Sequence, residues 1–176
     1  MLYNGKNALS TTAPKPLYLL DECISHRFTV PFKALGYDIK SIHDVFPKDQ
    51  LILQGKKSAE DPDIIQWIGK QQSDYGLIGI WITDDWEASK LHAKLILAHS
   101  ICVFWICDPL NKSLNAIQQL QVLAMLIEEA NLIFKTATSP IYLRGTIDNR
   151  KARLWTLNCH LMDKKLEWKK LILSSI

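Results

Sequence analysis

Short apolar runs alternate with amphipathic stretches through most of the chain. The apolar runs predict the strands of a mainly parallel sheet, and they lie at residues 17–20, 37–42, 77–82 and 101–106. The amphipathic stretches predict helices, at residues 26–35, 61–72, 84–99 and 113–134. This alternation predicts an α/β protein, a three-layer sandwich around a mainly parallel sheet.

The C-terminal quarter has a different pattern. Two strand-like runs, residues 141–147 and 151–157, flank Asp148-Asn149-Arg150 and predict a β-hairpin. A basic helix is expected at residues 162–173, and residues 45–57 are expected to form a loop. We therefore divide the chain into a flexible N-terminal arm (1–16), a core (17–110) and a C-terminal extension packed on the same domain (111–176).

The composition is that of one globular domain. The chain has 176 residues, of which 48% are hydrophobic and 22% charged, so it can bury a full core. No apolar stretch approaches the ~20 residues of a membrane span, and we expect no membrane partner. The four cysteines are scattered and lack CxxC spacing. Because no signal peptide is evident, this pattern predicts reduced thiols and a cytoplasmic protein.

Charge is distributed unevenly along the chain. Residues 135–176 carry nine Lys or Arg against three Asp or Glu, whereas residues 1–134 have a small acidic excess. An acidic body with a basic C-terminal segment fits a nucleic-acid substrate held near a metal site. Lysine-rich faces that are simply solvated are the alternative.

Acidic residues follow the predicted strands and open a predicted helix. Asp21-Glu22 follows the first strand, Asp84-Asp85 with Glu87 follows the third, and Asp61 and Asp63 begin the helix between them. Sites in parallel α/β sheets lie beyond the carboxyl ends of the strands. Acids gathered there repel each other, and a divalent cation relieves the repulsion. Oxygen ligands indicate Mg²⁺ or Mn²⁺, because no His/Cys cluster has zinc spacing.

Each of these acids also has a structural explanation. Asp61 fits a helix N-cap, Asp63 complements the helix dipole, and Asp84 with Glu87 fits a capping box. Asp21 differs, because it follows an apolar strand directly and has no helix to cap there. The metal hypothesis therefore depends on the conjunction of the acids.

Other chemistries have little support in the sequence. The chain lacks a glycine-rich dinucleotide loop, a P-loop lysine and a serine elbow. Its five histidines are scattered, and His26, which is nearest to the acids in sequence, is expected at the surface. A receiver-like phosphoacceptor domain also clusters acids, but it needs a lysine after the last core strand, where this chain has Ile106-Cys107-Asp108-Pro109.

The order of the motifs resembles a known family. Residues 17–25 (LYLLDECIS), 34–39 (ALGYDI), 61–65 (DPDII) and 81–87 (WITDDWE) resemble, in order and spacing, the motifs of compact PIN-like proteins related to VapC-type toxins. The resemblance covers roughly residues 17–108. Cys23 stands where the family has Asn, and Glu87 stands where it has a last Asp.

The resemblance implies a metal-dependent ribonuclease with a PIN-like catalytic core at residues 17–110. Asp21 and Asp85 would be the main Mg²⁺ or Mn²⁺ ligands, with Asp61 completing the site. Three further acids would hold water on the metal: Glu22, Asp84 and Glu87. The RNA backbone would contact Arg144, Arg150 and Lys151. The family also suggests the toxin of a toxin–antitoxin pair, with an antitoxin protein as partner.

Two questions stay open at this level. A catalytically silent PIN-like module that binds RNA or protein is the alternative to an enzyme, because of Cys23. The helix at residues 113–134 has a wide apolar arc that either is buried in its own core or, with the hairpin, forms a homodimer surface. We favour the homodimer, because an isolated hairpin needs a packing partner.

Overall fold

A computed structural model of the chain describes residues 14–107, 114–135, 140–148, 151–157 and 168–170. The strands are β1 (Pro16–Leu20), β2 (Asp38–Ser41), β3 (Ile78–Thr83), β4 (Cys102–Ile106), β5 (Tyr142–Asp148), β6 (Lys151–Leu157) and β7 (Trp168–Lys170). The helices are α1 (Thr29–Ala34), α2 (Ile42–Val45), α3 (Lys48–Leu53), α4 (Asp61–Tyr75), α5 (Trp86–Leu91), α6 (Ala93–Ala98) and α7 (Ala116–Ile133), with a 3-10 turn η1 (His26–Phe28) before α1.

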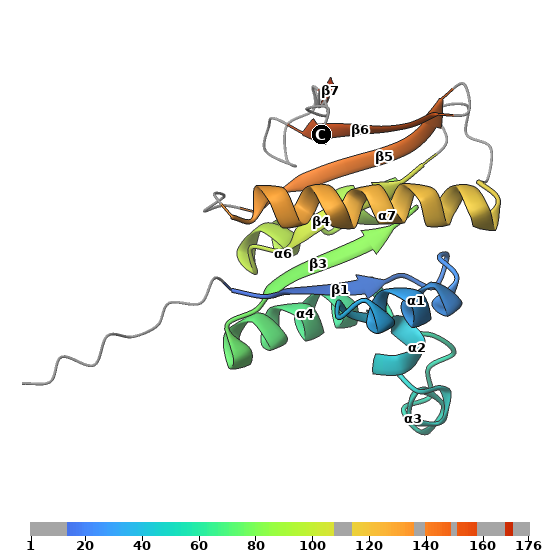
Figure 1. The fold of residues 1–176 in the computed structure, drawn as a ribbon. Coiled ribbons are helices and arrows are strands. Elements are labelled where there is room, and N and C mark those ends of the chain that lie inside the picture. The colour runs from blue at the N-terminus through green and yellow to red at the C-terminus, as the bar shows by residue number, and fades with distance from the viewer. Residues whose placement is uncertain (1–13, 108–113, 136–139, 149–150, 158–167, 171–176) are drawn as a thin grey trace, which may run out of the picture.

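The described strands form one seven-stranded sheet in the order β2-β1-β3-β4-β5-β6-β7 (Figure 1). Neighbouring strands from β2 to β5 are parallel, and β6 and β7 are added antiparallel. The predicted α/β class and mainly parallel sheet are therefore confirmed. The predicted hairpin is confirmed as β5 and β6, but β5 also pairs with β4, so the hairpin continues the central sheet.

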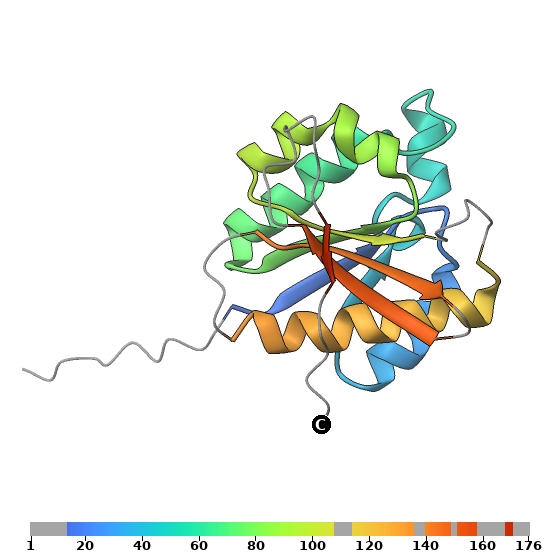
Figure 2. The ribbon, with the colours of Figure 1, turned by 90° about the horizontal axis from the view of Figure 1, so that it is seen from above.

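Helices cover both faces of the sheet (Figure 2). α1 and α7 pack on one face, in a core that includes Tyr18 and Phe104. α4, α5 and α6 pack on the other face, in a core that includes Leu19 and Trp105. Successive strand residues point to opposite faces, so β1 and β4 contribute to both cores. These strands are buried on both sides, which explains why their sequences are apolar throughout.

The crossover from β4 to β5 has the opposite hand to the crossover before it. From β3 to β4 the chain steps away from β1 with α5 and α6 on the α4 face. From β4 to β5 it steps in the same direction, but with α7 on the opposite face. Right-handed connections strongly predominate among crossovers between parallel strands. The position of α7 is instead favoured by burial of five apolar residues: Val122, Leu123, Leu126, Ile127 and Ala130.

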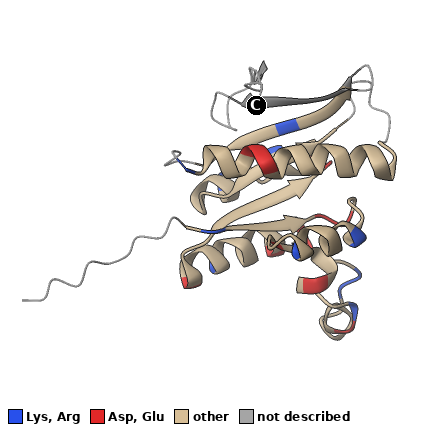
Figure 3. Cartoon of the chain, in the orientation of Figure 1, with Lys and Arg blue, Asp and Glu red and all other residues tan. Residues whose placement is uncertain are grey.

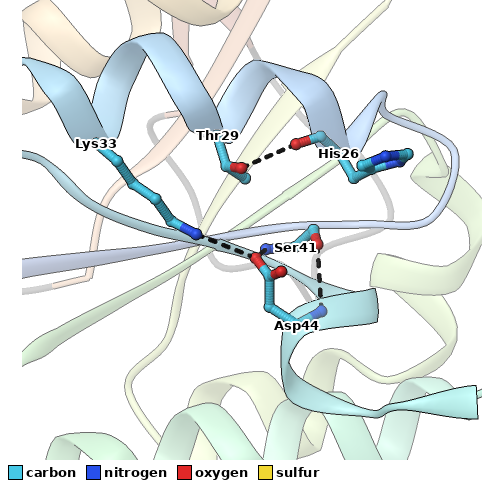
Figure 4. Close-up of polar contacts among 5 residues, drawn as sticks. All are labelled: His26, Thr29, Lys33, Ser41 and Asp44. Atoms are coloured by element: carbon cyan, nitrogen blue, oxygen red, sulfur yellow. Dashed lines mark hydrogen bonds and ion pairs between the residues drawn. The ribbon is translucent and has the colours of Figure 1, made fainter.

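The loop expected at residues 45–57 is partly wrong. α2 ends at Val45, and the whole of α3 lies within this range. α2 begins with a reciprocal cap (Figure 4). The Asp44 amide donates to Ser41 Oγ over 3.3 Å, and the Ser41 amide donates to Asp44 Oδ2 over 3.0 Å. Lys33 Nζ lies 3.4 Å from the same Oδ2. Such side-chain caps stabilise helices too short to produce a periodic apolar pattern.

Two predicted helices also differ from the structure. The helix expected at residues 84–99 is interrupted at His92, whose φ of −103° and ψ of 15° separate α5 from α6. The helix expected at residues 162–173 is wrong where it is described, because Trp168–Lys170 form β7 and pair with β6. The rest of that segment lies outside the described residues, as do residues 1–13 of the expected arm.

α7 confirms the helix expected at residues 113–134 over its described part. It contacts β4, β5 and β6 of its own chain. Because β5 continues the central sheet, the hairpin is not isolated, and the reason for which we expected a homodimer is wrong. The homodimer itself stays a prediction. None of the described helices is both long and apolar enough to cross a bilayer.

The packing of α7 predicts that alanine substitution of a buried and of an exposed aliphatic residue of this helix changes the free energy of unfolding by different amounts. Leu126 is 0% exposed and Ile117 is 71% exposed. Leu126→Ala is expected to lower the free energy of unfolding by about 2–5 kcal/mol, because it leaves a cavity in the core. Ile117→Ala should change it by less than ~0.5 kcal/mol. Urea denaturation followed by circular dichroism measures both, and equal losses would contradict this packing.

Candidate functional site

The carboxyl ends of β1 and β3 lie side by side at the topological switch point of the sheet. There the order of strand addition reverses, because β2 lies on one side of β1 and β3 on the other. From β1 the chain turns to α1 on one face, and from β3 it turns to α5 on the other. Such a switch point leaves a crevice where ligands bind in open α/β sheets. No Lys, Arg, Asp or Glu occurs within β1, β3 or β4, and acidic residues begin where β1 and β3 end (Figure 3).

Asp21 lies at the centre of this end of the sheet. It extends β1 by one residue, because its amide donates to the Ile82 carbonyl over 2.9 Å. The side chain is only 7% exposed. Its Oδ2 accepts the Thr83 hydroxyl at 2.5 Å, and its Oδ1 accepts the Glu22 amide at 2.9 Å. Burial raises the pKa of the Asp21 carboxyl, and Asp61 raises it further, against the lowering effect of the two hydrogen bonds.

Thr83 connects Asp21 to the start of α5. Its buried hydroxyl donates to Asp21 and accepts the Asp85 amide at 2.9 Å. One hydroxyl therefore fixes a side chain after β1 and the backbone after β3. Thr83 is not among the site residues predicted from the sequence. Its position as the last residue of an apolar strand, directly before two acids, is the signal that could have identified it.

Asp85 caps α5. Its Oδ1 accepts the Ala88 amide at 3.0 Å. The N-cap is therefore one residue later than expected, and the capping box expected from Asp84 and Glu87 is wrong. The Asp85 carbonyl also accepts the Ser89 hydroxyl at 3.1 Å, and Ser89 in turn accepts Trp105 Nε1 at 2.7 Å. The start of α5 is thereby attached to the buried core strand β4.

Asp61 is the first residue of α4, and Glu60 occupies the N-cap position, so the expected Asp61 N-cap is wrong. Asp61 Oδ2 lies 3.5 Å from Nε2 of His92. Burial raises the pKa of the Asp61 carboxyl, His92 lowers it, and Asp85 raises it. Asp63 has a different environment: its carboxylate binds Lys56 and its pKa is lowered by that contact.

The three catalytic candidates are therefore electrostatic neighbours. Asp61 acts on Asp21, and Asp85 acts on Asp61, in each case raising the pKa of the affected carboxyl. Within the described ranges, however, no three His, Cys, Asp or Glu side chains form a group that could hold one ion. The protein contacts of these carboxylates include the Thr83 hydroxyl and Glu22 amide at Asp21, the α5 cap at Asp85 and His92 at Asp61.

The other predicted metal residues lie at the rim. Glu22 is exposed and contributes its amide to Asp21. Asp84 is exposed, and its amide donates to Cys23 Sγ over 3.4 Å. Glu87 has an 81% exposed side chain that pairs with Lys90 at 2.9 Å. Glu87 is thus directed to Lys90 rather than to the three central acids.

Cys23 occupies the position at which the resemblance expects Asn. Its Sγ lies 3.8 Å from Thr83 Oγ1 and accepts the Asp84 amide. Burial of the sulfur raises the pKa of the thiol, and the charges of Asp21 and Asp84 raise it further. The thiol therefore supplies contacts to the same strand end, as an uncharged group.

The basic residues predicted to bind RNA are not brought to this site by any described contact. Arg144 is half-buried within β5, and β4 separates β5 from β3. Arg150 lies outside the described residues. Lys151 opens β6, and only its backbone is described. RNA binding by these three residues stays a prediction.

The raised pKa of Asp21 predicts a pH-dependent difference in stability. An acid whose pKa is higher in the folded state destabilises the metal-free fold at pH values above its ordinary pKa of 3.8. Asp21→Asn removes this cost. The free energy of unfolding of the variant minus that of the wild type should rise with pH, from about pH 4 through the raised pKa, and then level off. Chemical denaturation in EDTA across the pH range measures it.

Asp44→Asn is the matched control for this experiment. The pKa of Asp44 is lowered, because the Ser41 amide and Lys33 outweigh its slight burial. Its variant should therefore be less stable than the wild type, with a difference that shrinks as the pH falls. The same slope for both variants would contradict the environment described for Asp21.

No protein-family model matches the chain, and neither a curated protein nor a solved structure is significantly similar to it. The resemblance to PIN-like proteins therefore rests on the short motifs quoted above. The function has to be argued from the side chains at the ends of β1 and β3.

Proposed function

We propose that the chain is a divalent-metal-dependent ribonuclease of the PIN-like type, which hydrolyses RNA phosphodiester bonds. The observation that carries the proposal is the buried carboxylate of Asp21 at the switch point, with Asp61 and Asp85 as electrostatic neighbours. A carboxylate in this position costs free energy unless something stabilises its charge. Among the described residues, the stabilising contacts of Asp21 are neutral hydrogen bonds from Thr83, the Glu22 amide and Cys23, without an ion pair to Lys or Arg.

The chemistry of the donors, rather than a formed ligand group, is that preferred by a hard divalent cation. Carboxylate oxygens are the ligands that Mg²⁺ and Mn²⁺ take in proteins. Asp21, Asp61 and Asp85 would hold the ion, with Glu22 and Asp84 around it. Glu87 would have to leave its contact with Lys90 to join them. When bound, such an ion makes a water nucleophilic at neutral pH and neutralises charge on the phosphodiester.

The chain's own residues supply the positioning that this chemistry requires. The Thr83 hydroxyl orients the Asp21 carboxylate, and the α5 cap orients Asp85. Both are attached to strands whose interiors are fully buried, so the two carboxylates are held on rigid elements. Catalysis of phosphoryl transfer depends on such positioning and on electrostatics.

RNA as the substrate is supported by the basic C-terminal segment and by the motif resemblance. Residues 135–176 carry the excess of Lys and Arg that a polyanion would need. By the same resemblance we propose a toxin of a toxin–antitoxin pair, with an antitoxin partner. Within the described residues the thiols of Cys23 and Cys102 are free, which supports the proposed cytoplasmic location.

A catalytically silent PIN-like module is the second candidate. Two observations favour it: each central carboxylate already contacts a protein group, and Cys23 replaces the expected Asn. Such a module would bind RNA or protein without cleaving it. Calorimetry with Mg²⁺ and Mn²⁺ distinguishes the two, because only the enzyme requires the ion.

The ribonuclease proposal predicts metal-dependent cleavage that is lost in two variants. Asp21→Asn and Asp61→Asn should each reduce Mn²⁺-dependent cleavage of a fluorescent single-stranded RNA by roughly 10³-fold, because several kcal/mol of transition-state stabilisation is removed. The control is Asp74→Asn, an exposed acid in the last turn of α4. It should cleave at the wild-type rate. A wild-type chain that neither binds the ion by calorimetry nor cleaves the RNA would favour the silent module.

A further inference from the structure

The strand β5 carries two buried hydroxyl groups without a partner. The hydroxyls of Tyr142 and Thr146 form no hydrogen bond to any described residue. Tyr142 is 8% exposed and Thr146 is 3% exposed. A buried hydroxyl that bonds to nothing costs free energy, so nearly all such groups in folded proteins bond to protein, water or a ligand. Two of them on one strand point to a group that binds there.

The geometry of β5 directs both hydroxyls away from α7. Leu143 packs in the core beneath α7, and a Cβ atom added to Gly145 would collide with Val122 of that helix. Side chains alternate along a strand, so the residues on either side of Leu143 and Gly145 face the opposite way. They are Tyr142, Arg144 and Thr146. An arginine therefore lies between the two hydroxyls, and it is half-buried.

The register of the sheet places Arg144 in one row with the candidate site. Thr83 pairs with Trp105, and Trp105 pairs with Arg144. Asp21 extends β1 beside the same end of β3. Neighbouring strands lie ~4.8 Å apart, so the Cα atoms of Arg144 and Thr83 are about 10 Å apart. Under the proposed function, an RNA strand with one phosphate at Asp21 can therefore bring another phosphate to Arg144.

The three side chains supply the donors that a phosphate group requires. An arginine side chain is always charged and bonds to phosphate through two N–H groups at once. Burial raises the pKa of the Tyr142 hydroxyl to about 12, so this group keeps its proton at neutral pH and can donate it to an anion. Residues two apart on a strand are separated by about 7 Å, roughly the span of one phosphate with a hydrogen bond at either end.

We propose that Arg144, with the hydroxyls of Tyr142 and Thr146 on either side, binds a phosphate group. This inference rests on the proposed function for the source of the phosphate, which is the RNA backbone next to the bond that is cleaved. A free phosphate compound has the same chemistry, and the experiment distinguishes the two sources. The site gives a use to two hydroxyls that the described fold leaves unbonded.

The test removes one hydroxyl at a time with Tyr142→Phe and Thr146→Val, which keep the shape of each side chain. Fluorescence anisotropy measures binding of a labelled single-stranded RNA to the full-length chain in EDTA, where metal-dependent cleavage does not proceed. The loss of one hydrogen bond should weaken binding roughly three- to tenfold. Arg144→Gln should weaken it at least about tenfold and reduce the slope of log K against log salt by ~0.7, the value for one phosphate contact of a single strand.

Tyr18→Phe is the matched control. The Tyr18 hydroxyl belongs to a buried side chain in the α7 core, but it donates to Asn131 over 3.3 Å. Its removal should lower the melting temperature and leave RNA binding unchanged. In phosphate-free buffer, Tyr142→Phe and Thr146→Val should keep or raise the melting temperature, because each removes a buried hydroxyl without a partner. A hydroxyl with a role in packing alone would change stability and not binding.

Inorganic phosphate distinguishes the two sources. It should raise the melting temperature of the wild type and have less effect on both hydroxyl variants. This result with unchanged RNA affinity would support the phosphate site and exclude RNA as its source. Unchanged RNA affinity together with an unchanged phosphate response in both variants would overturn the inference, even if the chain cleaves RNA. Weakened RNA binding in the variants of a chain that shows no Mn²⁺-dependent cleavage would support the site and contradict the proposed ribonuclease.

Discussion

The fold depends on the need to cover both faces of strands that are apolar throughout. β1, β3 and β4 have buried side chains on either side, so a helical layer on one face alone would leave half of them in water. α4, α5 and α6 cover one face, and the short α1 covers only part of the other. α7 covers the remainder, which explains why its crossover departs from the usual hand: burial of its apolar side outweighs a preference of connection geometry.

The same strands determine where chemistry can occur. Polar side chains are excluded from their interiors, so the first residues able to carry charge are those directly after the strand ends, Asp21 after β1 and Asp84 after β3. Thr83 is the exception, a polar residue inside the buried strand end. Its hydroxyl is satisfied on both sides, by Asp21 and by the Asp85 amide, and it converts two neighbouring strand ends into one site.

The sequence was sufficient to predict what depends on local pattern. The apolar runs identified β1, β3 and β4, and the turn residues identified the β5–β6 hairpin, because each signal lies within a few residues. The cap of α5 was misplaced by one residue, since Asp84 and Asp85 are chemically alike and only the Thr83 contact distinguishes them. The pairing of His92 with Asp61 could not be predicted, because it results from core packing between α4 and α6 and has no local signal. Trp168–Lys170 was predicted to be part of a basic helix. The pairing with β6 that makes it a strand is also non-local, so no nearby residues indicate it.

Among the described strands, β2 forms one edge of the sheet and pairs with β1. An exposed edge is a template on which another chain can add a strand, and long apolar edges promote aggregation. β2 is only four residues long, its Asp38 is exposed, and Lys40 lies over the Trp67 ring at 5.7 Å. A charge of each sign on so short an edge disfavours further pairing there. The strongly apolar centre of this sheet is thereby kept from growing by strand addition at the β2 side.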